Sequence, residues 1–302
     1  MSRLTLGTRK SLMAMTQSGL VADTLTQVTG HAVELVGVTT EGDVSKDLLA
    51  QIGGTGVFVN GLRERLLSGE VDFAVHSLKD LPTAPAKGIV LAAVPFRDDP
   101  RDALCGPAKL ADLPRGARVG TGSPRRMAQL RALRPDLDVV AIRGNADTRL
   151  RKVADGELDA VVLAYAGLGR IGRMDAVAEV FEPEQMLPAP GQGALALECR
   201  ADRADLVAIL GTVDDPLSRA AITAERTILA VLEAGCSAPV GAYAAVHEEE
   251  LHLTAAVVAY DGSRQVRLSA SGHLHEAGRL GRELANRLLA EGADQLMGEQ
   301  AP

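Results

Sequence analysis

Apolar stretches of strand length alternate with helical stretches along much of the chain. Strands are indicated at residues 73–75 and 160–163, and helical runs follow Ser11 and Ser123. Alternation of strands with helices is typical of α/β domains. The pattern therefore predicts an α/β fold.

Two short echoes indicate that the chain contains two related units. The sequence LGT at residues 6–8 returns as VGT at residues 119–121, and GEVD at residues 69–72 returns as GELD at residues 156–159. The echoes occur in the same order and beside the same kinds of element. They predict two similar α/β units.

The C-terminal part has a different pattern. Residues 251–258 and 265–268 have the composition of strands and flank a turn at Asp261 and Gly262, and a helical stretch covers residues 276–290. This part is therefore expected to form an antiparallel hairpin followed by a helix.

The length and composition fit two or three domains. The chain has 302 residues, 46% of them hydrophobic, so that each domain has enough apolar residues for a core. The first residues lack the apolar stretch of a signal peptide, and no run approaches the length of a membrane span. With three cysteines in all, the chain is expected to be cytoplasmic and to have no membrane partner.

Positive charge is concentrated in one segment. Residues 115–152 contain nine arginines and one lysine against three acids, a net charge of +7, whereas the whole chain has −7, which leaves −14 for the remainder. Such a patch favours an anionic ligand, and the arginine fork suits carboxylate or phosphate. Nucleic acid is a poor candidate because the chain is acidic, lacks Trp and is 2% aromatic. Arg131, Arg134 and Arg151 are interpreted as solvated helix-face residues.

The sequence GTGSPRR at residues 120–126 predicts an anion site at a helix N-terminus. Its serine is a good N-cap and its proline suits the first helical position, so free backbone N–H groups are directed at the loop. Arg125 and Arg126 then lie in the first turn, where cations oppose the helix dipole, and a bound carboxylate would resolve this conflict. Arg9 and Ser11 repeat the arrangement in the first unit.

Asp80 and Cys236 are the candidates for chemistry. Asp80 follows the carboxyl end of an apolar strand, where ligand sites of α/β sheets collect, although a local turn-forming role is equally compatible. Cys236 lies in the turn formed by residues 233–239, where it is either a small buried hydrophobe or a thiol that holds a ligand covalently. His76 is expected to be packed, and Cys105 and Cys199 have no functional signal. No CxxC pair or His/Cys cluster indicates a metal site or a disulfide.

Five motifs in order resemble the porphobilinogen deaminase family, also called hydroxymethylbilane synthases. The resemblance extends from about Leu4 to the last helix. The motifs are VHSLKDLP at 75–82, GTGSPRR at 120–126, RGN at 143–145, LPAPGQG at 187–193, and the Cys236 loop.

The resemblance implies an α/β fold of three domains. Two would be doubly wound units like those of periplasmic binding proteins, with the chain crossing back near Gly191 to complete the first. The third would be a small α+β domain whose antiparallel sheet and helices carry the Cys236 loop. The expected boundaries are 1–96 with 193–213 for domain 1, 100–189 for domain 2, and 216–302 for domain 3.

By the same resemblance, Cys236 would carry a dipyrromethane cofactor through a thioether. This cofactor would prime the addition of four porphobilinogen units, each losing ammonia, to give linear hydroxymethylbilane in haem and porphyrin biosynthesis. Such a path develops positive charge on a pyrrole that must then lose a proton, which requires a fixed carboxylate. Asp80 matches the family's catalytic aspartate in position.

The carboxylates of the growing chain require positive donors, since an unpaired buried carboxylate is costly. Phe58 matches an aromatic residue that packs on a pyrrole ring, although a core role is nearly as compatible. The other positions that match cofactor-binding and substrate-binding residues of the family are Arg9, Ser11, Lys79, Thr121, Ser123, Arg125, Arg126, Arg143, Arg149 and Arg170.

The chain departs from the family pattern at Gln51 and Thr55, where many relatives have lysine. Both lie in a stretch rich in glycine and charge, residues 41–56, which is interpreted as a lid over the site. Charge pairing between this stretch and bound carboxylates is therefore in doubt.

A two-lobed anion receptor without chemistry is the alternative function. The arginines alone would suffice for it, but the lack of an export signal and the Cys236 loop argue against it. The chain is expected to act as a monomer on porphobilinogen, without metal or nucleic acid.

Overall fold

A computed structural model describes residues 3–39, 59–235 and 238–298. The described residues divide into two compact units. The first unit contains residues 3–39, 59–98 and 193–220. The second contains residues 99–192, 221–235 and 238–298.

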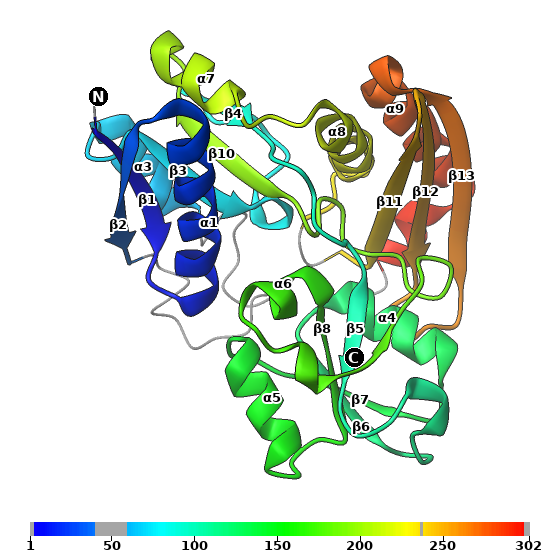
Figure 1. Cartoon of the computed structure of the whole chain (residues 1–302). Coiled ribbons are helices and arrows are strands. Elements are labelled where there is room, and N and C mark those ends of the chain that lie inside the picture. Colours follow the sequence, from blue (N-terminus) through cyan, green and yellow to red (C-terminus); the bar gives the residue numbers. More distant parts are fainter. Residues whose placement is uncertain (1–2, 40–58, 236–237, 299–302) are drawn as a thin grey trace. The chain divides into compact units, whose positions relative to one another are not determined.

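The first unit is built on a five-stranded mixed sheet with the strand order β2-β1-β3-β10-β4 (Figure 1). β1 is parallel to β2 and β3, whereas β10 is antiparallel to β3 and β4. The chain thus returns to this sheet after residue 193, as expected. The elements are β1 (Arg3–Arg9), α1 (Leu12–Thr29), β2 (Ala32–Val38), α3 (Asn60–Ser68), β3 (Phe73–Ser77), β4 (Ile89–Ala93), β10 (Leu195–Arg200) and α7 (Ala204–Gly211), and α8 (Pro216–Val231) begins here.

The second unit contains a five-stranded sheet with an equivalent order, β7-β6-β8-β5-β9. Here β6 is parallel to β7 and β8, and β5 takes the antiparallel place that β10 has in the first sheet. The elements are β5 (Asp102–Cys105), β6 (Arg118–Thr121), α4 (Pro124–Leu133), β7 (Asp138–Ala141), α5 (Ala146–Ala154), β8 (Ala160–Ala164), α6 (Tyr165–Arg170) and β9 (Val177–Val180).

Helices cover both faces of each five-stranded sheet. In the first unit, α1 and α7 bury Leu25 and Leu210 against one face, and α3 buries Leu66 against the other. In the second unit, α4 packs Leu130 on one face and α5 packs Leu150 on the opposite one. Burial of these side chains stabilises each layer, at roughly 25 cal/mol per Å² of apolar surface removed from water.

The two sequence echoes occupy equivalent places in the two sheets. The Asp72 carboxylate accepts a hydrogen bond from the Thr5 amide at 2.8 Å, and the Asp159 carboxylate accepts one from the Arg118 amide at 2.7 Å. Asp72 directly precedes β3 and binds β1, and Asp159 directly precedes β8 and binds β6, which has the place of β1 in the second sheet. The prediction of two similar α/β units is therefore confirmed down to individual hydrogen bonds.

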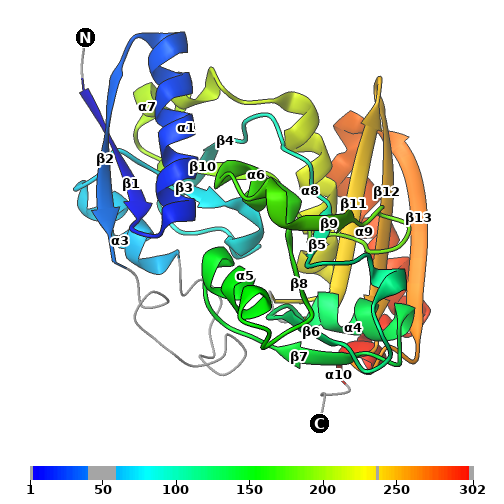
Figure 2. The same cartoon turned by 60° about the horizontal axis from the view of Figure 1, so that its bottom comes forward.

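The C-terminal residues form a separate antiparallel sheet in the order β11-β12-β13 (Figure 2). Helices α9 and α10 pack against it. The expected hairpin and helix are present, and the first strand, β11, was not predicted. These elements are β11 (Val240–His247), β12 (Glu250–Val258), β13 (Gln265–His273), α9 (Ala277–Ala290) and α10 (Ala293–Gly298).

This small sheet belongs to the same compact unit as the second five-stranded sheet. The Ala242 amide donates to the Pro188 carbonyl at 3.0 Å, and Arg267 donates to the carbonyls of Pro183 and Glu184. The α/β class, with two five-stranded sheets and one small antiparallel sheet, is confirmed. The three domain boundaries given above stay a prediction.

Candidate active site

The first unit places its predicted site residues at the ends of two neighbouring parallel strands. β1 ends at Arg9, and Ser11 is the N-cap of α1. β3 is followed directly by a short 3-10 helix, Leu78–Asp80, which carries Lys79 and Asp80. Because β1 and β3 are parallel neighbours, these residues lie at the same edge of the sheet.

Asp80 is held in a fixed turn, but its carboxylate is left available. The preceding Ser77 exchanges hydrogen bonds with the buried amide of Gln17 at 3.2 and 3.3 Å, and the Leu78 amide donates to the Ala194 carbonyl. Asp80 itself is half-buried, and no residue that the structure describes donates a hydrogen bond to its carboxylate. A purely turn-forming role would require such a bond, so the geometry favours the chemical role.

His76 is packed beneath this edge, as expected. Its Nε2 lies 3.3 Å from Glu198 of β10, whose carboxylate is also bound by Nε and Nη2 of Arg63 at 2.9 and 2.6 Å. Burial acts to raise the pKa of Glu198, but His76 and Arg63 more than offset this and lower it to about 2. Glu198 therefore stays ionised and ties α3 to the sheet.

Replacing Glu198 with glutamine is expected to destabilise the protein by about 3 kcal/mol at pH 7, because Arg63 loses a buried carboxylate. A carboxylate with a lowered pKa stabilises the fold above its ordinary pKa and loses this contribution as the pH falls toward 2. The difference between wild type and variant should therefore shrink below about pH 4.5. Urea unfolding at pH 7, 4 and 3 measures it.

The exposed pair of Glu34 and Arg3 is the control for this experiment, and Glu34→Gln should change stability by less than about 1 kcal/mol. A Glu198→Gln effect that is the same at every pH would show that the carboxylate charge does not contribute.

In the second unit, the GTGSPRR motif forms the end of β6 and the start of α4, as predicted. Ser123 is the N-cap and Pro124 begins the helix, but the Ser123 side chain makes no capping hydrogen bond to it. The Ser123 amide donates instead to Oγ1 of the buried Thr121 at 3.2 Å. The hydroxyl and the first N–H groups of α4 are thus available to an anion.

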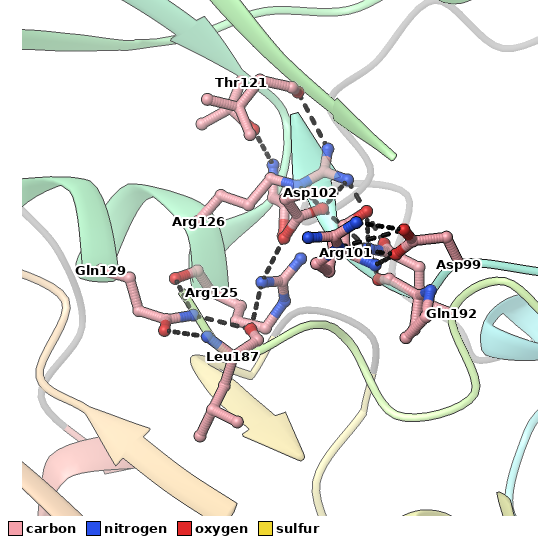
Figure 3. Close-up of polar contacts among 12 residues, drawn as sticks. Asp99, Arg101, Asp102, Thr121, Arg125, Arg126, Gln129, Leu187 and Gln192 are labelled. Carbon is pink, nitrogen blue, oxygen red and sulfur yellow. Dashed lines mark hydrogen bonds and ion pairs between the residues drawn. The ribbon is translucent and has the colours of Figure 1, made fainter. Parts of the chain in front are cut away.

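Arg125 and Arg126 are buried, at 3% and 5% exposure, and both pair with the fully buried Asp102 (Figure 3). Arg126 also donates to the carbonyl of Val162, and Arg125 to that of Leu187. The two guanidinium groups hold the pKa of Asp102 well below its usual range, although burial acts to raise it. The sequence predicts that a ligand carboxylate offsets these two arginines, whereas in the structure Asp102 supplies part of this negative charge. Direct contact of the two arginines with a ligand stays a prediction.

Arg143 and Arg149 complete a cluster of positive charge around the motif. A side chain at Gly122 would lie 3.3 Å from Nη2 of Arg149, so this guanidinium is beside the loop. Burial, together with the charges of Arg126 and Arg143, lowers the pKa of Arg149 to about 10. Nη1 of Arg143 is buried and has no hydrogen-bond partner within residues 3–39, 59–235 and 238–298. Arg149 donates through Nε to the Gly144 carbonyl at 2.9 Å. Among the described residues neither Arg143 nor Arg149 pairs with an acid, and a ligand with carboxylates would supply this anionic partner.

Replacing Arg149 with glutamine is expected to raise the KM for an anionic substrate about 10- to 100-fold, since a charged hydrogen bond contributes about 1.5–3 kcal/mol. Arg151, two residues along α5 and exposed, is the matched control. Arg151→Gln should change KM less than about twofold. Equal effects in steady-state kinetics would contradict the assignment of Arg149 to the site.

The interpretation of Arg131 and Arg134 as solvated was wrong. Arg131 donates to the Tyr260 carbonyl at 2.7 Å. Arg134 pairs with Asp136 and donates to the Leu110 and Leu113 carbonyls, which fastens the end of α4. Arg151 is exposed as interpreted.

Two of the three cysteines are unsuited to covalent chemistry. Cys105 and Cys199 are fully buried in β5 and β10, and burial raises the pKa of both thiols, that of Cys105 to about 12. Cys236 lies outside the described residues, as do Phe58, Gln51 and Thr55. The resemblance implies that Cys236 is the attachment site, and this assignment stays a prediction.

The remaining predicted residue, Arg170, lies in the last turn of α6 and is half-buried. Within the described part of the chain, no group of His, Cys, Asp or Glu is arranged to hold a metal ion. No helix of the described residues is long and apolar enough to cross a membrane.

Two family models match this chain. The model described as porphobilinogen deaminase, dipyromethane cofactor binding domain, matches residues 4–208. The model of the porphobilinogen deaminase C-terminal domain matches residues 219–290. The chain belongs to the porphobilinogen deaminase family.

Relatives agree over almost the whole length. Porphobilinogen deaminase of Thermobifida fusca is 62% identical over 98% of this chain and 96% of its own. Porphobilinogen deaminase 1 of Streptomyces coelicolor is 59% identical over 99% of this chain and 98% of its own. Among solved structures, the methionine binding protein MetQ matches at 14% identity over 70% of this chain and 89% of that chain, with a TM-score of 0.45.

The residues of the second unit fit the dipyrromethane cofactor of the porphobilinogen deaminase family. Such a group brings several carboxylates. The matching donors are Nη1 of Arg143, which has no partner among the described residues, the guanidinium of Arg149, and the hydroxyl of Ser123, which makes no capping hydrogen bond. These three side chains would hold the cofactor's carboxylates in this unit.

Sequence reasoning missed three polar residues that support the site. Asp102, Gln192 and Gln17 are buried at 0%, 1% and 5% exposure. An acid at the start of the apolar strand sequence DALC was a usable signal for Asp102, because acids are almost never fully buried unless paired. Gln17 lies within an ordinary helical sequence and gave none.

Proposed function

We propose that this chain joins four molecules of porphobilinogen into linear hydroxymethylbilane, with loss of one ammonia from each, in tetrapyrrole biosynthesis. The family match over residues 4–208 and 219–290 is the observation that carries the proposal. When bound, the dipyrromethane cofactor supplies a covalent primer, which we assign to Cys236. The chain's own residues then bind, orient and exchange protons.

Asp80 is the proposed catalytic residue. Loss of ammonia from an aminomethylpyrrole leaves a cationic methylene on the substrate, and the pyrrole carbon of the growing chain that attacks this methylene becomes cationic and must afterwards lose its proton. A carboxylate held near the pyrrole N–H stabilises this charge and accepts the proton. The fixed turn after β3 and the hydrogen-bond capacity left on Asp80 support this role.

The arginine cluster is proposed to bind the acetate and propionate groups that every porphobilinogen unit carries. Nη1 of Arg143 has no hydrogen-bond partner among the described residues, and Arg149 donates to the neutral carbonyl of Gly144. Thr121 ends β6, and Ser123 follows it in the adjoining loop. In the first unit, Arg9, Ser11 and Lys79 lie at the strand ends beside Asp80 and are proposed to bind further carboxylates. Arg170 is proposed to bind cofactor or substrate side chains, and Phe58 is proposed to pack on a pyrrole ring, which are the roles that the resemblance implies.

We further expect the chain to act as a cytoplasmic monomer with no nucleic-acid partner. Its overall negative charge and low aromatic content support the last expectation.

Incubation of the purified protein with porphobilinogen tests the proposed function. We expect ammonia and hydroxymethylbilane to be released in a ratio of about four to one, as the chemistry of four successive deaminations requires. An anion receptor would bind porphobilinogen without releasing ammonia, and that result would replace the proposed function with the alternative.

A further inference from the structure

Asp102 has a place in the fold that the proposed chemistry does not use. It is the first residue of β5 and follows the segment 99–101, where the chain enters the second unit. Its side chain is fully buried. A buried carboxylate is retained only with partners that offset the loss of its hydration.

The partners of Asp102 come from two separate parts of the chain. Nε and Nη2 of Arg126 lie 3.0 and 2.6 Å from Oδ1, and Nη1 of Arg125 lies 2.8 Å from Oδ2. The amide of Gln192 donates to Oδ1 at 2.8 Å and to the Pro100 carbonyl at 2.7 Å. Figure 3 shows these side chains directed at Asp102.

The same turn of α4 is also bound to the segment that leaves the second unit, residues 187–192. Nη1 of Arg125 donates to the Leu187 carbonyl at 2.5 Å. Gln129, one turn along α4, donates to this carbonyl at 3.0 Å and accepts from the Leu187 amide at 2.8 Å. The start of α4 is therefore fastened to both segments by which the chain enters and leaves this sheet.

These contacts explain how the start of α4 keeps its position. Two cations in a first helical turn oppose the dipole, and Ser123 gives no side-chain cap. The Asp102 carboxylate supplies a negative charge that offsets these two cations, through its ion pairs with Arg125 and Arg126. The turn carries Ser123 and lies beside Arg149, so its position decides where these donors meet a ligand.

We propose that Asp102 is a positioning residue of the anion site, acting through Arg125 and Arg126 on the first turn of α4. The inference rests on the proposed function, in which this turn binds the carboxylates of cofactor and substrate. Asp102 does not touch a ligand itself, because its carboxylate is fully buried among chain residues.

The test compares Asp102→Asn with Leu130→Ala, both isolated from cells that make porphobilinogen. Leu130 is fully buried on the core side of α4, so its truncation weakens the same helix without touching Asp102. The adduct is quantified by intact mass in samples shown by circular dichroism to be folded. KM and kcat are then measured on the fraction that carries it.

Asp102→Asn is expected to lower the adduct fraction at least about fivefold relative to Leu130→Ala, and to raise KM about tenfold with kcat within about threefold, the pattern of misplaced binding groups. Equal adduct fractions and equal KM values in the two variants would overturn the role of Asp102. An adduct missing from the wild type as well would instead contradict the proposed function.

If Asp102→Asn does not fold, Gln192→Leu tests the role of Asp102 instead. It removes the neutral amide that donates to Asp102 and to the Pro100 carbonyl and that accepts from Nη2 of Arg126. Both ion pairs of Asp102 stay in place. A rise in KM of at least about threefold is expected, since a hydrogen bond to a charged group contributes about 1.5–3 kcal/mol. An unchanged KM in the folded Gln192→Leu protein would overturn the inference.

Discussion

Cys236→Ala protein is expected to form no hydroxymethylbilane and to carry no covalent adduct. The reason is that neither of the other two thiols can replace it: Cys105 and Cys199 are fully buried in strands, and burial raises the pKa of both, so the nucleophilic thiolate is scarce. Without an attached primer, each added unit would be free to diffuse away. Product formation and intact mass are measured on the same sample.

The matched variants are Cys105→Ala and Cys199→Ala. Each leaves a small cavity in a core and should lower stability by about 1 kcal/mol or more, while the adduct and turnover are retained. Turnover that persists in Cys236→Ala, or that disappears in Cys105→Ala with its fold intact, would show that Cys236 is not the attachment site.

Asp80→Asn is expected to lower turnover at least ~10²-fold, the loss typical of removing one positioned acid–base or electrostatic group. Asparagine has nearly the same size and keeps the turn, but it cannot remain anionic beside a developing positive charge. Binding of pyrroles should persist, because the arginines that are proposed to bind their carboxylates are unchanged. The measurement is the rate of hydroxymethylbilane formation by folded Asp80→Asn protein that carries the Cys236 adduct.

Two further variants make this result specific. Asp80→Glu keeps the charge and moves it by about one methylene, so some activity should remain. Asp23→Asn, which removes an exposed acid on α1 of the same unit, should behave as wild type. Near-normal turnover in Asp80→Asn would remove Asp80 from the mechanism and transfer its role to another acid.

The features that could be predicted from sequence were those set by local chemistry. Ser123 was predicted as an N-cap because serine is preferred at that position before a helical run, Ser11 was predicted to repeat the arrangement, and both are N-caps. The echoes around Gly120 and Asp159 were short, yet they identified two sheets of equivalent strand order. Each of these signals lies within a few residues of the structure that it predicts.

The features that sequence reasoning missed depend on contacts between distant residues. Arg134 was interpreted as a solvated helix-face residue, but loop carbonyls more than twenty residues away accept its hydrogen bonds. Asp102 and Gln192 are ninety residues apart in the sequence and meet only because the segment 187–192 contacts the start of β5. Long-range pairing of this kind leaves no local pattern, so the partner of Arg125 and Arg126 was sought in a ligand.

The intact mass of the denatured protein tests the central claim most directly, because a ligand held by ion pairs dissociates on denaturation and a thioether does not. Protein purified from cells that make porphobilinogen should be heavier than its sequence mass by two linked pyrrole units, and the added mass should lie on the peptide that contains Cys236. Denatured protein with the plain sequence mass from the same cells would contradict the account.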